Sequence, residues 1–331
     1  GTRLKLLDAK GLKKYFPVQE GFLEKLFAKE QKYVKAVDDV SLSLDEEEVL
    51  ALVGESGCGK TTTGKLILRL IEPTAGEVLF KGTDLTSLTK EEMRKLRKKI
   101  QMIPQDPFTS FNPRMKIGDA VKHPLEIHGI GEEGKRRKKV FELLEEVGLR
   151  PARKFYNSYP DDLSGGEKQR ASIARSMITN PELVVADEPV SMVDASSKAK
   201  VIDLMNDLKN EFGLTYLFIT HDLAASKYIS DRIAVMYVGQ IVEKGTIEDI
   251  FDNPLHPYSL ALLSTIPEPG EKKLDKGRIN VKGEIASPRD PPTGCRFHPR
   301  CPRATEECSQ DVPPLEHVEG DHYVACWHPI E

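Results

Sequence analysis

The chain has 331 residues, of which 39% are hydrophobic and 30% charged, and this composition excludes collagen-like, coiled-coil and wholly disordered proteins. Its length suggests about two cores. No apolar run approaches the ~18 residues of a membrane span and the first residues lack a signal-peptide core, so we expect a soluble protein that reaches a membrane only through a partner. The formal net charge of −4 gives no reason to expect a nucleic-acid partner.

The first half of the chain starts with strands. Residues 34–53 are predicted to form two strands around a turn at 45–48, and the apolar run at 49–53 is typical of a buried parallel strand. An amphipathic helix at 21–33 is expected to dock on its own domain, with a membrane or a partner subunit as the alternative. A helix at 61–71 and a strand at 77–80 follow.

A mostly helical block is predicted over residues 89–162, where Thr89 and Glu92 form a capping box at its start. Strand patterns return at 183–187, 216–220 and 232–237, with a helix at 196–211. The pattern therefore predicts an α/β fold interrupted by helices.

A glycine-rich sequence, GESGCGKT, occupies residues 54–61 between the apolar run and the predicted helix. It fits the G-x-x-x-x-G-K-[ST] pattern of a phosphate-binding P-loop. The glycines let backbone N–H groups face phosphate oxygens, Lys60 can reach the β- and γ-phosphates, and Thr61 can ligate Mg²⁺. The predicted ATP-binding residues here are Gly54, Ser56, Gly57, Cys58, Gly59, Lys60, Thr61 and Thr62.

Two further motifs narrow the class of P-loop protein. LSGGEKQR at 163–170 and LVVADEP at 183–189 together resemble the signature motif and Walker B segment of ATP-binding cassette (ABC) ATPases. Other elements of that family match in order: Gln105 resembles its Q-loop, SMVD at 191–194 its D-loop and His221 its H-loop. The resemblance covers residues 10–250 and argues against a P-loop kinase or GTPase.

The resemblance implies a role for each residue of these motifs. Asp187 would bind Mg²⁺, with Thr61 and Gln105 as further ligands. The predicted catalytic residues are Glu188, which would orient or deprotonate the attacking water, His221, which would contact the γ-phosphate, and Gln105.

ATP contacts are also implied outside the P-loop. An aromatic residue would stack on adenine, and the sequence leaves Tyr15 and Phe16 as equal candidates. A second ATPase subunit would present its signature to the nucleotide, through the positions matching Ser164, Gly165, Gly166, Glu167 and Asp194. Because each motif occurs once, two subunits would share their ATP sites. The resemblance implies that the second one is a paralogue, and the sequence itself leaves an identical subunit open.

One position departs from the family pattern. The signature is LSGGE where LSGGQ is usual, which places the carboxylate of Glu167 near a highly charged nucleotide. Like charges at 4 Å repel by about 4 kcal/mol at an effective dielectric constant of 20. We therefore expect Glu167→Gln to strengthen ATP-dependent dimerisation if this carboxylate faces the phosphates.

The last 37 residues hold four of the five cysteines, Cys295, Cys301, Cys308 and Cys326, and 12 of the 22 prolines follow residue 250. We expect an irregular segment organised by its thiols rather than by a core. The residues alone leave two disulfides, structural Zn²⁺ and an iron–sulfur cluster open, although disulfides are rare in the cytosol. Nothing in the sequence places this segment near the ATP phosphates.

A second resemblance concerns this tail. HPYSLALLSTIP at 256–267 with the C-x5-C-x6-C-x17-C spacing resembles the C-terminal extension of ABC ATPases from oligopeptide and dipeptide importers, where four cysteines bind a [4Fe–4S] cluster. The implied cofactors are thus ATP, Mg²⁺ and a [4Fe–4S] cluster, with Zn²⁺ as the alternative at the cysteines.

The implied architecture is an α/β P-loop NTPase (RecA-like) core with an antiparallel β subdomain, an inserted helical subdomain at about 89–180 and a metal-bound extension. The ATPase domain is expected at 1–267 and the extension at 268–331. The implied function is ATP hydrolysis that drives import of peptides or short oligosaccharides. The implied partners are two membrane permease subunits and an extracytoplasmic solute-binding protein, with this subunit on the cytoplasmic face of the membrane.

A different class, ABC ATPases that act on nucleic acid or ribosomes, is the alternative. Those proteins carry long coiled coils, zinc-hairpin insertions or tandem cassettes, and the sequence has none of these features.

Overall fold

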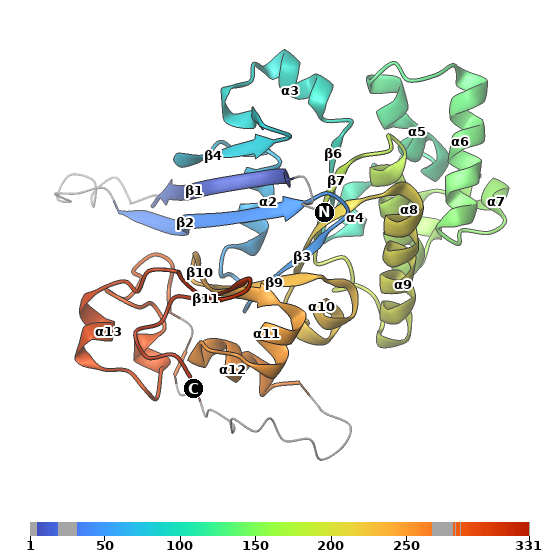
Figure 1. Cartoon of the computed structure of the whole chain (residues 1–331). Coiled ribbons are helices and arrows are strands. Elements are labelled where there is room, and N and C mark those ends of the chain that lie inside the picture. The colour runs from blue at the N-terminus through green and yellow to red at the C-terminus, as the bar shows by residue number, and fades with distance from the viewer. Residues whose placement is uncertain (1–4, 19–31, 267–280, 282, 285, 331) are drawn as a thin grey trace, which may run out of the picture. The chain divides into compact units, whose positions relative to one another are not determined.

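The computed structural model describes residues 5–18, 32–266, 281, 283–284 and 286–330 (Figure 1). The chain forms two compact units, which we name the helical unit (residues 1–6, 44–49 and 87–219) and the P-loop unit (residues 7–43, 50–86 and 220–331). The amphipathic helix predicted at 21–33 falls almost wholly outside the described residues. Within the described ranges, no helix is long and apolar enough to cross a membrane.

The helical unit contains a parallel sheet with β7 in the middle. Its strands are β6 (Ile100–Ile103), β7 (Leu183–Asp187) and β8 (Thr215–Thr220). Every residue of β7 and β8 is buried, which explains why both are continuous apolar runs rather than alternating ones. The register pairs Ile103 with Ala186 and Asp187 with Ile219, so the sheet carries Asp187 at the carboxyl end of its middle strand.

Helices make up the rest of this unit. They are α3 (Lys90–Leu96), α4 (Pro107–Ser110), α5 (Ile117–Ile127), α6 (Glu133–Glu146), α7 (Ala152–Asn157), α8 (Gly165–Met177) and α9 (Ala195–Phe212), with a 3₁₀ turn at Pro160–Asp162. Thr89 and Glu92 form the predicted capping box at the start of α3. The prediction that 89–162 is mostly helical overlooks β6, a four-residue strand whose pairing with β7 decides its conformation.

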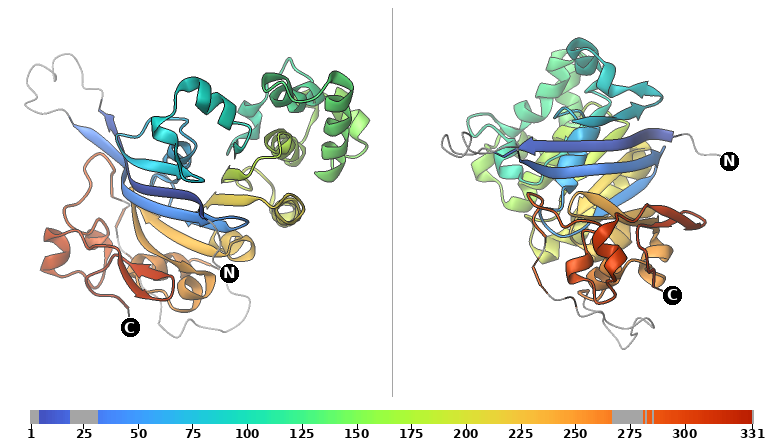
Figure 2. Two further views of the ribbon diagram at one scale, coloured as in Figure 1. Left: turned by 45° about the horizontal axis from the view of Figure 1, so that its top comes forward. Right: turned by 90° about the vertical axis from the view of Figure 1, so that its left-hand side faces the viewer.

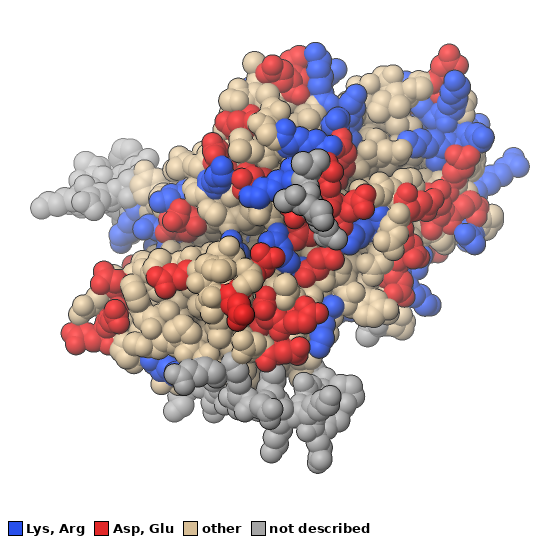
Figure 3. Space-filling view, viewed as in Figure 1, with Lys and Arg blue, Asp and Glu red and all other residues tan. Residues whose placement is uncertain are grey.

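The amphipathic pattern of α6 shows why the block folds as packed helices. Val140, Leu143 and Leu144 are buried on one face. The basic run at 135–139 lies on the same helix, and Figure 3 shows lysine and arginine side chains gathered over α6. The apolar face thus packs inward while the charges remain in solvent.

The P-loop unit contains an antiparallel sheet of four strands in the order β2-β1-β4-β5. Their bounds are β1 (Lys5–Pro17), β2 (Tyr33–Asp45), β4 (Ala75–Phe80) and β5 (Thr83–Asp84). Figure 2 shows the long strands β1 and β2 side by side. This sheet is the predicted antiparallel β subdomain, and it includes β1, a strand that lies outside the segments predicted above.

The same unit contributes a second run of paired strands in the order β11-β12-β10-β9-β3. They are β3 (Val49–Val53), β9 (Arg232–Tyr237), β10 (Gln240–Thr246), β11 (Glu316–Glu319) and β12 (His322–Val324). β3 is buried throughout and pairs in parallel with β9, as its apolar sequence predicts. Its helices are α2 (Lys60–Ile67), α10 (Leu223–Ile229), α11 (Ile247–Asp252), α12 (Pro257–Leu263) and α13 (Glu306–Gln310), with 3₁₀ turns at Leu85–Ser87 and His298–Arg300.

The cysteine-rich segment is more regular than predicted. Its strand β12 pairs with β10, so the C-terminal residues extend the run of strands that also includes β3. The fully buried carboxylate of Glu243 binds His322 at 2.8 Å and accepts the backbone N–H groups of Leu255 and His256. Pairing with a strand of the core supplies the order that the proline-rich sequence does not indicate by itself.

Candidate ATP-binding site

The P-loop turns directly from β3 into α2, in the strand–loop–helix order that the motif requires. Gly59, the residue before α2, has φ 108°, and no side chain caps the helix. A Cβ atom at Gly59 would lie 2.2 Å from the carbonyl oxygen of Ala36, and one at Gly54 would lie 2.2 Å from that of Met236. The loop therefore needs glycine at both positions, and its helix start presents backbone N–H groups suited to phosphate.

Lys60 is buried within this loop, with 4% of its surface exposed. Its ammonium group donates to the carbonyl oxygens of Gly54 at 2.8 Å and Glu55 at 3.0 Å. Burial raises the pKa of the nearby Cys58 thiol, so this cysteine is a neutral small residue of the loop rather than a reactive thiolate. The positive charge of Lys60 is thus held inside the loop, beside the start of α2, where backbone N–H groups and a cation suit a phosphate.

The two candidate adenine-stacking residues differ in their surroundings. The hydroxyl of Tyr15 donates to Asp38, and burial together with this hydrogen bond raises the pKa of Tyr15 to about 12. Phe16 is more exposed, and the ammonium group of Lys14 lies 5.1 Å from its ring centroid. Both rings remain candidates.

The helical unit brings Glu188 and Gln105 together. Glu188 follows β7 directly and adopts φ 46°, a backbone conformation that is uncommon for residues other than glycine. Its carboxylate accepts the side-chain amide of Gln105 at 3.1 Å, and its backbone N–H donates to the carbonyl of Ile219. Asp187, one residue earlier, is 2% exposed at the end of the buried strand. Such a pair of acids at a strand end can bind a cation and position a water.

The signature motif forms the start of α8. Ser164 caps this helix, and Glu167 completes a capping box with it. A Cβ atom at Gly166 would meet nothing within 4 Å, so the helix start offers an open surface without side chains. These features fit a phosphate surface that depends on backbone N–H groups and the helix dipole.

The carboxylate of Glu167 is turned back onto its own helix start. It accepts the backbone N–H and the hydroxyl of Ser164, each at 2.8 Å, and the hydrogen bonds from Ser164 lower the pKa of Glu167. The charged carboxylate therefore stabilises the folded protein at pH values above the pKa that Glu167 has in the unfolded chain. This contribution is lost as the pH falls through the lower pKa of the folded state.

A pair of substitutions at Glu167 separates its two roles. Glu167→Gln keeps an acceptor for Ser164 but removes the charge that strengthens the cap, so we expect a loss of stability smaller than that of Glu167→Ala. We expect it to strengthen ATP-dependent dimerisation at low salt, with a gain that shrinks as salt rises. Glu167→Ala is expected to lower the free energy of unfolding by about 1 kcal/mol because it removes the box. Equal dimer affinities for wild type and Glu167→Gln would contradict a carboxylate near the phosphates.

Asp194 and His221 occupy the remaining motif positions. Asp194 caps α9 by accepting the backbone N–H of Ser197 at 3.1 Å. His221 is exposed on the segment between β8 and α10, in the P-loop unit.

Sequence reasoning missed three residues that hold the P-loop. The backbone N–H of Glu55 donates to the hydroxyl of Tyr258 at 2.9 Å, and the carboxylate of Glu55 binds the guanidinium of Arg300. The C-terminal segment, which was not expected near the phosphates, thus contacts the phosphate-binding loop itself. The sequence signal that was available is Glu55 itself, because a negative charge inside an anion-binding loop needs a positively charged partner nearby.

The four cysteines Cys295, Cys301, Cys308 and Cys326 line one small cavity. Burial raises the pKa of Cys295, Cys301 and Cys326, the last to about 12. Four thiols around one cavity are a donor set that suits iron–sulfur or zinc chemistry. Among the described residues, however, no three histidine, cysteine, aspartate or glutamate side chains are arranged to hold a metal ion.

Comparison with known proteins agrees with this geometry. Residues 37–191 match the ABC transporter family, and a structure of the ATP-binding cassette MJ0796, a dimer in a post-hydrolysis state with ADP and phosphate, is similar with a TM-score of 0.63 and 30% identity over 73% of this chain and 98% of that one. The nucleotide site is therefore that of an ABC ATPase, and the enzyme hydrolyses ATP.

A second match, toward the C-terminus, identifies the family more closely. Residues 242–308 match the C-terminal region of oligopeptide/dipeptide transporters. The oligopeptide transport ATP-binding protein AppF of Bacillus subtilis is 48% identical over 97% of this chain and 96% of its own length. The dipeptide transport ATP-binding protein DppF of Haemophilus influenzae is 48% identical over 98% of this chain and 96% of its own. The chain belongs to this family of transporter ATP-binding proteins.

Proposed function

We propose that this ATPase drives the import of oligopeptides or dipeptides through two membrane permease subunits. The observation that carries the proposal is the joining of a complete ABC motif set to the C-terminal region of oligopeptide/dipeptide transporters. Short oligosaccharides are the alternative cargo. An extracytoplasmic solute-binding protein would deliver the cargo, and the ATPase would lie at the cytoplasmic face of the membrane without crossing it.

Two ATPase subunits would form the working enzyme, the second one a paralogue. The open helix start at Gly166 supports this arrangement, because it offers backbone N–H groups for a phosphate and a Cβ atom there would meet nothing within 4 Å. The similar cassette MJ0796 is itself described as dimeric. In such a pair, the P-loop of one subunit and the signature of the other would contact the same ATP.

The motif residues would then divide the work of binding and hydrolysis. Lys60 and the P-loop amides would bind the phosphates, and Thr61, Asp187 and Gln105 would hold Mg²⁺, which supplies positive charge beside the phosphates when bound. The carboxylate of Glu188, oriented by the amide of Gln105, would accept a proton from the attacking water. His221 would contact the γ-phosphate. Tyr15 or Phe16 would stack on adenine.

Transport in vesicles tests the substrate class. The subunit would be co-purified with its permease, its partner ATPase and its binding protein, and uptake of labelled peptides of two to five residues would be compared with that of short oligosaccharides at equal concentrations. We expect peptide uptake only when ATP is supplied on the side of the vesicle membrane where the ATPase lies. ATP-dependent uptake of oligosaccharides alone would overturn the peptide assignment without affecting the ATPase.

For the extension, taken as residues 268–331, we propose that the four cysteines hold a [4Fe–4S] cluster. Their common cavity supports it. His256, His298 and His328 line the same cavity, and Zn²⁺ is the alternative. Bound iron and sulfide would supply cross-links between loops that have little apolar core of their own.

Metal analysis provides the test. Protein purified without oxygen is expected to be brown, with broad absorption near ~400 nm and about four irons per chain. Cys308→Ser should lose the iron, whereas the neighbouring Ser309→Ala should keep it. Colourless protein with one zinc per chain would contradict the cluster.

A further inference from the structure

The P-loop carries an acidic residue at its second position. Glu55 lies between Gly54 and the glycine-rich turn, in a loop whose chemistry is otherwise arranged for anions. The backbone carbonyl of Glu55 accepts a hydrogen bond from the ammonium group of Lys60, so Glu55 is in direct contact with the cation expected to bind phosphate. A free carboxylate in this place would repel a nucleotide polyphosphate.

Arg300 neutralises that carboxylate. Its two terminal nitrogens donate to the two oxygens of Glu55, at 2.9 Å and 3.2 Å, in the fork-to-fork geometry in which arginine binds carboxylates most strongly. The side chains are only 12% and 25% exposed, so solvent and salt screen the pair less than a surface pair.

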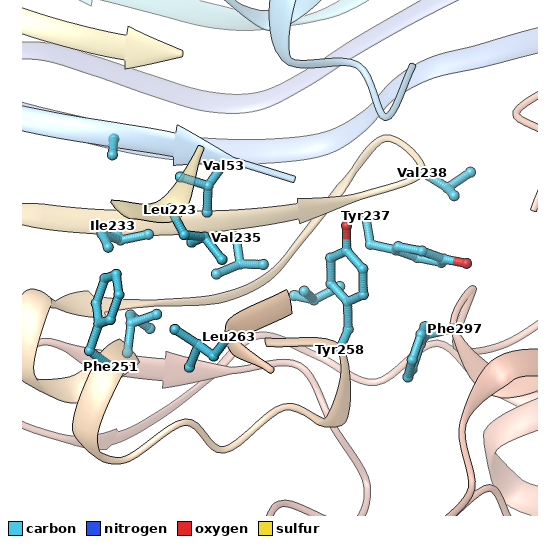
Figure 4. Packing of buried hydrophobic residues seen from close by; sticks show 13 residues of the cluster. Val53, Leu223, Ile233, Val235, Tyr237, Val238, Phe251, Tyr258, Leu263 and Phe297 are labelled. Atoms are coloured by element: carbon cyan, nitrogen blue, oxygen red, sulfur yellow. The ribbon is translucent and has the colours of Figure 1, made fainter. Parts of the chain in front are cut away.

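Two aromatic residues lie against Arg300, one from the end of β9 and one from the cysteine-rich extension itself. It ends the 3₁₀ turn at His298–Arg300, and its guanidinium lies 5.8 Å from the ring of Tyr237 and 5.7 Å from that of Phe297. Figure 4 shows Tyr237, Tyr258 and Phe297 together in this buried cluster. Tyr258 from the same cluster accepts the backbone N–H of Glu55. The backbone N–H and the carboxylate of Glu55 are therefore both bound by residues that follow β9 in the chain.

A second arginine ties the extension to β2. Arg296 is 6% exposed and binds the carboxylate of Asp38 and the carbonyl of Val238. Asp38 also accepts the hydroxyl of Tyr15, one of the two candidates for adenine stacking. The extension thus contacts the rest of the P-loop unit at two separate points, Asp38 and Glu55.

We propose that Arg300 is a positioning residue for nucleotide binding, supplied by the cysteine-rich extension, which neutralises Glu55 and so makes the P-loop competent for ATP. The proposal rests on the proposed function only in taking ATP as the ligand of this loop. It makes the extension a part of the ATP half-site, and loss of the extension's fold would lower ATP affinity even though every recognised ATP motif lies outside it.

A double-mutant cycle tests the proposal. Arg300→Gln, Glu55→Gln and the double variant would be compared with wild type in the full chain by direct titration with Mg²⁺ and ATP, at low and high salt. Arg300→Gln is expected to weaken ATP binding about 10-fold, because it leaves the carboxylate unpaired beside the phosphates. The double variant is expected to return close to wild-type affinity, and the loss should be smaller at high salt.

The recovery separates electrostatics from simple damage to the fold. A misfolded loop would not regain affinity when a second residue is changed, and circular dichroism and thermal unfolding without nucleotide would show whether each variant is folded. Arg289→Gln, an exposed arginine of the same extension, is the matched control and should bind ATP as wild type does.

Two results would overturn the proposal: an unchanged dissociation constant for folded Arg300→Gln, or a loss that the double variant retains in full. Failure of the wild-type chain to bind ATP would instead refute the proposed function. Binding by wild type with no effect of Arg300→Gln would refute only the role of Arg300.

Discussion

Glu188→Gln is expected to leave ATP binding intact while lowering ATP turnover by ~10²- to 10⁴-fold, the usual effect of losing a general base. The structure strengthens this expectation. The carboxylate of Glu188 is held by the amide of Gln105 at 3.1 Å, at the end of a strand that is buried throughout. A glutamine at 188 can still contact Gln105 through its oxygen, so the geometry should persist while the proton acceptor is lost.

The measurement is ATP hydrolysis under saturating ATP, with nucleotide affinity determined separately. Glu211→Gln serves as a matched control, since Glu211 is an exposed acid on α9 of the same unit and belongs to none of the motifs. Near-normal turnover by Glu188→Gln would show that another group accepts the proton. Loss of ATP binding together with turnover would point to a structural role for the carboxylate.

Much of the fold could be predicted because its buried strands are continuous apolar runs. The runs at 49–53, 183–187 and 216–220 form β3, β7 and β8 with nearly the predicted bounds. The strand β6 was missed because its four residues contain a glutamine and take their conformation from pairing with β7. Short strands whose order comes from a neighbour leave little signal in local sequence.

The candidate site was predictable where its chemistry is local. The P-loop and the signature are continuous motifs in which glycine, serine and lysine have fixed spacings, and the structure places both at the start of a helix. The capping role of Glu167 was visible in principle, since Ser164 and Glu167 have the S-x-x-E spacing.

The contacts of the cysteine-rich extension could not be predicted in the same way. Arg300 and Glu55 are 245 residues apart, and the local sequence around either residue does not predict a contact with the other. The pairing of β12 with β10 and the packing of Phe297 in the buried cluster bring the C-terminal segment to the core of its unit. The partnership therefore depends on tertiary structure, and the acid in the P-loop shows only that some partner was needed.

Lys60→Ala is expected to weaken ATP binding by about 10- to 100-fold, because a hydrogen bond to a charged group contributes about 1.5–3 kcal/mol. The ammonium group of Lys60 is the loop's own cation, buried to 4% exposure and directed at the carbonyls of Gly54 and Glu55. Its removal takes away the positive charge that the phosphates would meet while leaving the backbone N–H groups in place.

A direct titration with labelled ATP measures this loss, and thermal unfolding without nucleotide shows whether the loop still folds. Lys65→Ala is the matched control, since Lys65 is an exposed lysine on the same helix. Unchanged affinity of a folded Lys60→Ala variant would mean that the backbone amides and the helix start bind the phosphates without this side chain. A loss of the same size in Lys65→Ala would instead indicate a general effect of net charge, which high salt should then abolish.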